Sequence, residues 1–231
     1  MIAIKNIYKK YNNNLVLNNV CFDIKRNIPL GLLGINGAGK TTLLMIIANL
    51  LKPDSGVVLF EEKPINKANT YLLLDGVRNF YWSVSVKENF YYYATLRGVK
   101  LRNIQNILEQ ERFLLLKNLW NKPFGYLSLG QKRMVAILFT QLINFKLMLL
   151  DEPSNGLDID NQRRAIDLIK HSARDKYMVV SSHDLDFLYK CCEEFAIINR
   201  GKMCSIIPKE ILNSKDELEI IYKRIIAEDN L

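Results

Sequence analysis

A glycine-rich stretch, GINGAGKTT at positions 34–42, constrains the fold more than any other part of the chain. It fits the pattern G-x-x-x-x-G-K-[ST], in which glycines let the backbone curl so that successive N–H groups point at phosphate oxygens. The preceding residues, 29–33, read as a short apolar strand, and residues 42–51 read as a helix. The helix N-terminus adds partial positive charge to the same place. The stretch therefore predicts a phosphate-binding loop, and a chance glycine-rich turn is the alternative.

Charged and hydroxyl side chains at two places fit this loop. Within it, Lys40 is expected to lie near the β- and γ-phosphates, and the Thr41 hydroxyl is expected to bind Mg²⁺. Further along, the apolar strand 147–150 ends in Asp151 and Glu152. Ligands bind at the carboxyl ends of strands in open parallel sheets, so we expect Asp151 to hold Mg²⁺ through water. Glu152 would then act on the water that attacks the γ-phosphorus. Taken alone, this segment could be an ordinary turn after a core strand.

Composition narrows the class of protein. A chain of 231 residues can bury one core, with or without an insert. No apolar run approaches the ~18 residues that a membrane span needs, and the N-terminus lacks the apolar centre of a signal peptide, so we expect a cytosolic chain. The net charge of +8 is spread over scattered Lys and Arg, so no nucleic acid partner is expected. The four cysteines include no C-x-x-C and are expected to be buried free thiols.

Alternating strand and helix patterns predict an α/β fold with a parallel sheet covered on both faces. The expected strands are 2–7, 15–17, 20–24, 30–33, 57–60, 71–74, 147–150, 177–181, 195–198 and 203–207, and the expected later helices are 134–145, 158–170, 184–192 and a last one near the C-terminus. Ser85 and Glu88 form a capping box that opens a helix, and a second helical pattern covers 101–116. Residues 78–133 therefore read as a helical insert. Ser214 and Glu217 predict a second capping box.

The stretch LSLGQ, residues 127–131, precedes a helix and has the features of a second anion site. Ser128 and the N–H groups near Gly130 can bind phosphate at that helix start. One γ-phosphate needs only one such site, so the second is expected to serve the nucleotide of another subunit. The alternative is a simple helix start.

Together these motifs resemble the ATP-binding cassette (ABC) ATPases over about residues 2–207. GINGAGKT matches the Walker A motif, LSLGQ the family signature, and LMLLDE the Walker B motif with its catalytic glutamate. SNGLD at 154–158 matches the D-loop, and SSHD at 181–184 contains the switch histidine, His183. The resemblance implies an α/β, RecA-like P-loop NTPase core with an antiparallel β edge subdomain over 1–77 and 134–231. An inserted α-helical signature subdomain would span 78–133.

The resemblance also implies a role for each matching residue. Glu152, His183 and Lys40 would carry catalysis, Tyr11 would stack on adenine, and Asp158 would lie at the dimer seam. ATP and Mg²⁺ would be held by Gly34, Asn36, Gly37, Ala38, Gly39, Lys40, Thr41 and Thr42. The ATP of the opposite subunit would be contacted by Ser128, Gly130 and Gln131.

One position departs from the family pattern. The family usually has Gln after the strand at 71–74, where this chain has Asp75. A carboxylate can ligand Mg²⁺ or hold a water as the Gln carbonyl does, although it adds negative charge near the triphosphate. Asp75 is therefore kept as a candidate metal ligand.

Residues 79–93 hold seven of the 23 aromatic residues. Phe90 and Tyr93 are expected to pack the helical insert. In the family this region receives a short cytoplasmic helix of the transmembrane subunit, and we expect Phe80, Tyr81 or Trp82 to touch it.

The sequence thus favours the ATP-hydrolysing subunit of an ABC transporter, and its DGVRNFYW segment, residues 75–82, resembles bacterial exporter subunits. It would form a homo- or heterodimer on Mg-ATP and bind transmembrane permease subunits at the cytoplasmic face of the membrane. One alternative is a soluble ABC ATPase acting on nucleic acid or ribosomes. The roughly 85 residues between Walker A and signature are too few for the long coiled coil of many such relatives. The other is a non-hydrolysing ATP-sensing regulator, which would need neither Glu152 nor His183.

Overall fold

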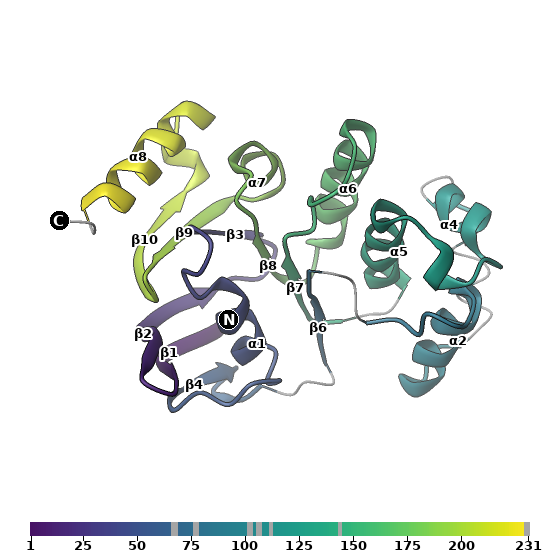
Figure 1. Cartoon of the computed structure of the whole chain (residues 1–231), viewed down its shortest axis with the longest axis horizontal. Helices are drawn as coiled ribbons and strands as arrows, with labels where there is room; N and C mark the ends of the chain where they lie inside the picture. The colour runs from purple at the N-terminus through teal and green to yellow at the C-terminus, as the bar shows by residue number, and fades with distance from the viewer. Residues whose placement is uncertain are drawn as a thin grey trace.

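Two β-sheets form the frame of the computed structural model, which describes residues 1–65, 69–75, 79–100, 104, 108–110, 113–142 and 145–228 (Figure 1). The larger sheet has the order β10-β9-β3-β8-β7-β6, with β10 antiparallel at one edge and the other strands parallel. Its strands are β3 (Leu30–Leu33), β6 (Thr70–Leu73), β7 (Leu147–Asp151), β8 (Tyr177–Ser181), β9 (Glu194–Asn199) and β10 (Lys202–Pro208). The smaller sheet is antiparallel and contains β1 (Ile2–Tyr11), β2 (Asn14–Ile24), β4 (Ser55–Phe60) and β5 (Lys63–Pro64).

The period-2 alternation of the parallel strands divides the core into two clusters. Leu72 and Leu149 point to the side of the smaller sheet and of helix α1 (Lys40–Ile47). Their neighbours Leu73 and Leu150 belong to the other cluster, which is covered by further helices. Those helices include α6 (Ile159–Ser172), α7 (Leu185–Cys191) and α8 (Lys215–Glu228). Both faces of the parallel strands are therefore covered, as the apolar strand sequences predict.

A helical group lies at the end of the molecule opposite α8 (Figure 1). It contains α2 (Val86–Leu96), α4 (Leu114–Leu119), the short helix η3 (Phe124–Tyr126) and α5 (Leu129–Leu142). The capping box of Ser85 and Glu88 is present at the start of α2, as predicted. None of the helices in the described parts of the chain is long and apolar enough to serve as a membrane span.

Aromatic side chains make the core of this helical group. The ring of Phe80 lies 4.8 Å from that of Phe124 and 5.3 Å from that of Phe139, and Phe80 is only 5% exposed. Phe90 is buried and Tyr93 is half-buried, as predicted. Phe80 is therefore a core residue, and of the three predicted partner contacts it is the one that the structure excludes. Tyr81 and Trp82 remain 52% and 54% exposed.

Several predicted features differ in detail. Helix α5 begins at Leu129 rather than at 134, because Ser128 and Gln131 cap its first turn reciprocally, with N···O distances of 3.2 and 3.1 Å. At the last helix the Glu217 carboxylate accepts from Asn213 and not from Ser214, so the second capping box is only half formed. Half of the predicted helical pattern 101–116 lies outside the described residues, as does the predicted boundary near 77, and α4 covers the last part of that pattern.

The four cysteines are free, but only Cys191 and Cys192 are buried, while Cys21 and Cys204 are exposed. The prediction of four buried thiols is therefore wrong for two of them. Both exposed cysteines lie on the edge strands β2 and β10, where alternate side chains face away from the core.

The backbone of Val16, in β2, joins the two sheets to the glycine-rich loop. A β-carbon on Gly39 would lie 2.9 Å from the Val16 carbonyl oxygen, and one on Gly201 only 2.2 Å from it. Gly201 stands in the turn between β9 and β10, and its N–H donates to Ala38 in the loop. We call this meeting of β2, the loop and the β9–β10 turn the Val16 junction.

Candidate active site

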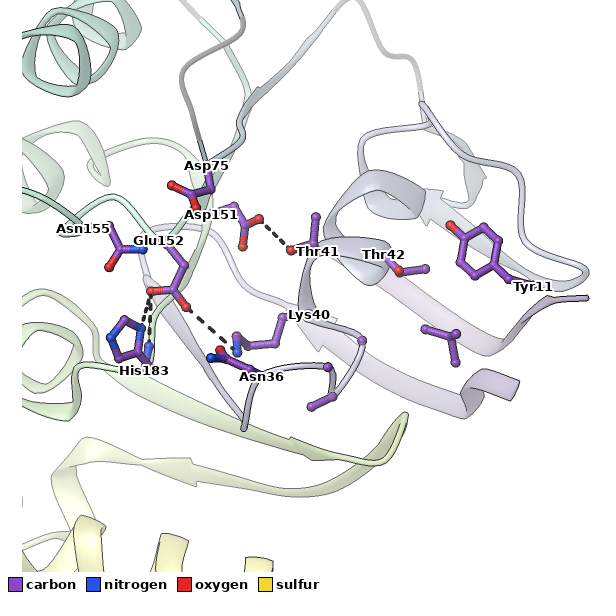
Figure 2. Close-up of a pocket in the computed structure, with 14 residues that line it drawn as sticks. Tyr11, Asn36, Lys40, Thr41, Thr42, Asp75, Asp151, Glu152, Asn155 and His183 are labelled. Carbon is purple, nitrogen blue, oxygen red and sulfur yellow. Dashed lines mark hydrogen bonds and ion pairs between the residues drawn. The ribbon is translucent and has the colours of Figure 1, made fainter. Parts of the chain in front are cut away.

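A cavity of about 470 Å³ opens where β3 and β7 end and α1 begins (Figure 2). Its described lining residues are Tyr11, Val16, Asn36, Gly37, Ala38, Gly39, Lys40, Thr41, Thr42, Asp75, Asp151, Glu152, Asn155 and His183. The fold therefore brings together most of the predicted nucleotide-binding and catalytic residues from segments far apart in the sequence.

Lys40 extends beneath the glycine-rich loop and is almost fully buried. Its Nζ donates to the carbonyl oxygens of Gly34 at 2.7 Å and Ile35 at 3.3 Å, and lies 3.9 Å from Glu152 Oε1. Burial lowers the pKa of Lys40, while the charges of Glu152 and Asp151 act in the opposite direction. Such a partly compensated buried ammonium favours a polyanion in the cavity. Gly39 makes the loop possible, because its φ of 101° is a conformation that L side chains rarely adopt.

The oxygen-bearing side chains of Thr41 and Asp151 lie side by side at one wall of the cavity (Figure 2). The Thr41 hydroxyl donates to Asp151 Oδ2 at 2.7 Å, and the Ser181 hydroxyl donates to Asp151 Oδ1. Asp151 and Ser181 are partners in the parallel register of β7 and β8, so the sheet itself sets this contact. Hydroxyl and carboxylate oxygens are the ligands that Mg²⁺ prefers, and these residues fit that ion.

Glu152 is held in a strained backbone conformation that turns its carboxylate to the cavity. Its φ is 49°, in the left-handed region that costs a non-glycine residue on the order of 1–3 kcal/mol. The Glu152 N–H donates to the Ser181 carbonyl at 3.0 Å, which fixes this turn. On the side chain, Oε2 lies 2.9 Å from His183 Nδ1 and accepts from the Ser182 hydroxyl at 3.2 Å. The arrangement places a carboxylate and an imidazole where they can act on one water.

Asp75 lines the same cavity, but its carboxylate is engaged. Arg133, from α5, donates to Asp75 Oδ1 through Nη2. No sequence signal pointed to Arg133, because it stands 58 positions from Asp75 and outside the recognised motifs. The hydrogen bonds from Ser181 and Ser182 to the acidic residues were also not predicted. Ser181 could have been predicted, because the two parallel strands that end in Asp151 and Ser181 lie side by side.

The signature residues lie elsewhere. Among the described residues, none of 127–131 lines the cavity. Instead the signature touches the D-loop of its own chain, since a β-carbon on Gly130 would lie 3.2 Å from the Gly156 carbonyl oxygen. Asp158 caps helix α6, with Oδ1 accepting from the Asn161 N–H at 2.8 Å. Gly34 does not line the cavity either, but its carbonyl oxygen accepts from Lys40 Nζ and so helps to position that side chain.

The sequence profile of the ABC transporter family matches residues 17–155, more than half of the chain. This chain belongs to the ABC ATPases. The matched span includes the Walker A loop, the signature and the Walker B strand. The ABC ATPase binds and hydrolyses ATP, and it is the ATP-binding subunit of a transporter.

Two relatives of this ABC ATPase illustrate the range of similar systems. The chain is 30% identical to the spermidine/putrescine import ATP-binding protein PotA of Mycoplasma capricolum, over all of this chain and 70% of that protein. It is 29% identical to the lantibiotic transport ATP-binding protein SrtF of Streptococcus pyogenes, over 99% of each chain.

Solved cassettes share the fold of this ABC ATPase. An ATP-binding subunit of an ABC transporter matches with a TM-score of 0.85 at 19% identity, over 97% of this chain and 99% of that one. A dimeric bacterial ABC transporter cassette matches with a TM-score of 0.78 at 23% identity, over 90% of this chain and 99% of that one. These matches support the α/β cassette architecture described above.

Proposed function

We propose that two cassettes sandwich Mg-ATP, with the cavity of one facing Ser128, Gly130 and Gln131 of the other. The observation that carries this proposal is the separation of the signature from the cavity within one chain. Exposed apolar side chains support it: Leu129 and Ile159, which follow Ser128 and Asp158, are 47% and 70% exposed. A partner would cover such residues. The partner is a second copy of this chain or a close relative.

The cavity residues account for hydrolysis within that sandwich. Thr41 and Asp151 would hold Mg²⁺, which supplies neutralisation of the phosphate charge when bound. Glu152 would accept the proton of the attacking water, and His183 would hold the water and the Glu152 carboxylate in line. Lys40 would stabilise charge on the β- and γ-phosphates, and Tyr11, 46% exposed at the rim, would stack on adenine.

A mixing experiment tests the composite site. Lys40→Ala and Ser128→Arg should each abolish ATP hydrolysis alone. In either homodimer, neither of the two sites has both an intact Walker A loop and an intact signature. Mixed together they should recover up to about a quarter of wild-type turnover, because about half of randomly formed dimers are mixed and each keeps one intact site. Steady-state phosphate release measures this. A mixture as inactive as its components, together with a monomeric Glu152→Gln chain in saturating Mg-ATP, would contradict the sandwich.

We further propose that the permease binds a surface made of Tyr81, Trp82, Tyr92 and Tyr126, here called the aromatic surface. Tyr126 is 87% exposed, and Trp82, 54% exposed, has Lys132 Nζ 4.1 Å from its ring centroid. Tyr81 and Tyr92 form an edge-to-face pair at 5.3 Å. Exposed aromatics with a flanking cation suit a short amphipathic helix of a transmembrane subunit. The chain would then lie peripherally at the cytoplasmic face of the membrane.

Site-specific photocrosslinking tests this surface. Benzoylphenylalanine at Trp82 is expected to capture an integral membrane protein in native membranes, seen as a new band that resists carbonate extraction. The same group at Arg163, an exposed residue of α6, serves as control and should give no such band. Equal capture from both positions, or none from Trp82, would count against the aromatic surface.

The direction of transport is proposed to be export. The support is the resemblance of DGVRNFYW, residues 75–82, to bacterial exporter subunits. ATP-driven uptake of substrate into inverted membrane vesicles, rather than into right-side-out vesicles loaded with ATP, is the measurement that distinguishes export from import.

A further inference from the structure

The ion pair of Asp75 and Arg133 joins the cavity wall to the signature helix. Asp75 follows β6 and has a side chain that is 56% exposed toward the cavity. Arg133 stands in α5, five positions after Ser128, and its side chain is only 3% exposed. Its Nη2 donates to Asp75, while its buried Nη1 has no hydrogen-bond partner among the described residues. One of the two terminal nitrogens of this buried guanidinium thus donates to a single carboxylate, that of Asp75.

The charges of the cavity explain why such a pair is useful. Three carboxylates line it, those of Asp75, Asp151 and Glu152, against a single lining cation among the described residues, Lys40. A triphosphate adds further negative charge, so a bare carboxylate at position 75 would repel it over the short distances of the cavity. Burial lowers the pKa of Arg133, whereas the charges of Asp75 and Glu152 favour its protonated form. Arg133 therefore already lies within the field of the catalytic carboxylate.

We propose that Arg133 is a positioning residue of the ATP site, which neutralises the Asp75 carboxylate and fixes it at the cavity wall. This inference rests on the site proposed above. The pair carries no net charge, so it can stand in for the neutral glutamine that the family resemblance implies at this position. Because its cationic half belongs to the signature helix, the neutrality of the cavity depends on where α5 lies. A purely structural ion pair would stabilise the fold without affecting the affinity for ATP.

Binding of ATP to full-length variants without Mg²⁺, measured by titration calorimetry, separates the two roles, since no hydrolysis occurs. Arg133→Gln leaves Asp75 unneutralised and is expected to raise the Kd for ATP at least about tenfold. Asp75→Gln alone should not weaken binding by more than about threefold, and Asp75→Gln combined with Arg133→Gln should return the Kd to within about threefold of wild type. Arg133→Lys, which keeps the charge, should rescue affinity.

Lys176→Gln is the control, because this half-buried lysine donates to the Thr140 carbonyl but does not line the cavity. It should lower the Tm without changing the Kd. An unchanged Kd in Arg133→Gln, or a tenfold loss in Asp75→Gln, would overturn the inference. If Arg133→Gln does not fold, the Asp75→Gln result still decides. Lys40→Ala distinguishes a failure of the Arg133 inference from a failure of the proposed ATP site. If Lys40→Ala retains wild-type affinity for ATP, the proposed site itself is wrong.

Discussion

Replacing Glu152 with glutamine should reduce kcat for ATP hydrolysis by at least ~100-fold, the loss typical of removing a general base. The amide keeps the size of the side chain but cannot accept a proton from water. ATP affinity should stay within about threefold of wild type, since Lys40, Thr41 and the loop amides are untouched. Steady-state phosphate release and equilibrium ATP binding measure the two effects. With hydrolysis stopped, the Mg-ATP complex should accumulate as a dimer in size-exclusion chromatography.

Glu194→Gln is a suitable control for this experiment. Glu194 is also a largely buried carboxylate with a lysine partner, Lys25 at 2.5 Å, but it lies outside the cavity lining. Its loss should lower stability and leave kcat within about twofold. Turnover by Glu152→Gln close to the wild-type rate would mean that another group activates the water. The assignment of Glu152 as general base would then have to be abandoned.

Phe80→Ala should destabilise the helical group by about 3–5 kcal/mol, the usual cost of removing a fully buried aromatic ring. The ring centroid of Phe80 lies 4.8 Å from that of Phe124 and 5.3 Å from that of Phe139, so removing the ring leaves a cavity among packed aromatic side chains. Urea unfolding followed by tryptophan fluorescence is well placed to detect this. Both tryptophans, Trp82 and Trp120, belong to the same region.

Tyr81→Ala provides the comparison one residue away. Tyr81 is 52% exposed, and its main contact is the edge-to-face pair with Tyr92, so its loss should cost less than about 1.5 kcal/mol. Equal losses for Phe80→Ala and Tyr81→Ala would contradict the assignment of Phe80 to the core. Comparing these two variants therefore separates an aromatic side chain that packs the core from one that is left exposed for a partner. The sequence alone did not make this distinction.

Local patterns predicted the parts of the fold that short segments determine. β3 and β8 match their predicted bounds, because continuous apolar runs ending in polar or glycine-rich stretches leave few alternatives. The glycine-rich loop was placed correctly for the same reason, since the positive φ angles that it needs occur at its own glycines, Gly37 and Gly39. The side chains expected at the cavity follow from that placement and from the carboxyl ends of parallel strands.

Features that depend on distant contacts could not be predicted in this way. Phe80 lies in a run of aromatics in which only the packing of three helices decides which rings turn inward. The partner of Asp75 comes from a helix 58 positions away and from no motif. The early start of α5 depends on a reciprocal cap between Ser128 and Gln131, two residues already assigned to a binding motif. Ser128 and Gln131 therefore have both a signature role and a capping role, and the sequence motif indicated only the first.

The Val16 junction has a consequence for how a nucleotide meets this protein. Since β2, the glycine-rich loop and the β9–β10 turn are in backbone contact, none of the three has room to shift without the others. The cradle for the phosphates is thus assembled before any nucleotide arrives, and little ordering entropy is lost there on binding. The opposite side of the cavity is held by side chains instead: the Asp75–Arg133 ion pair, and the Tyr71 side chain of β6, which donates to the Ala136 carbonyl and packs on Phe139 of α5. We therefore expect any shift during the ATP cycle to occur between β6 and α5 rather than at the Val16 junction.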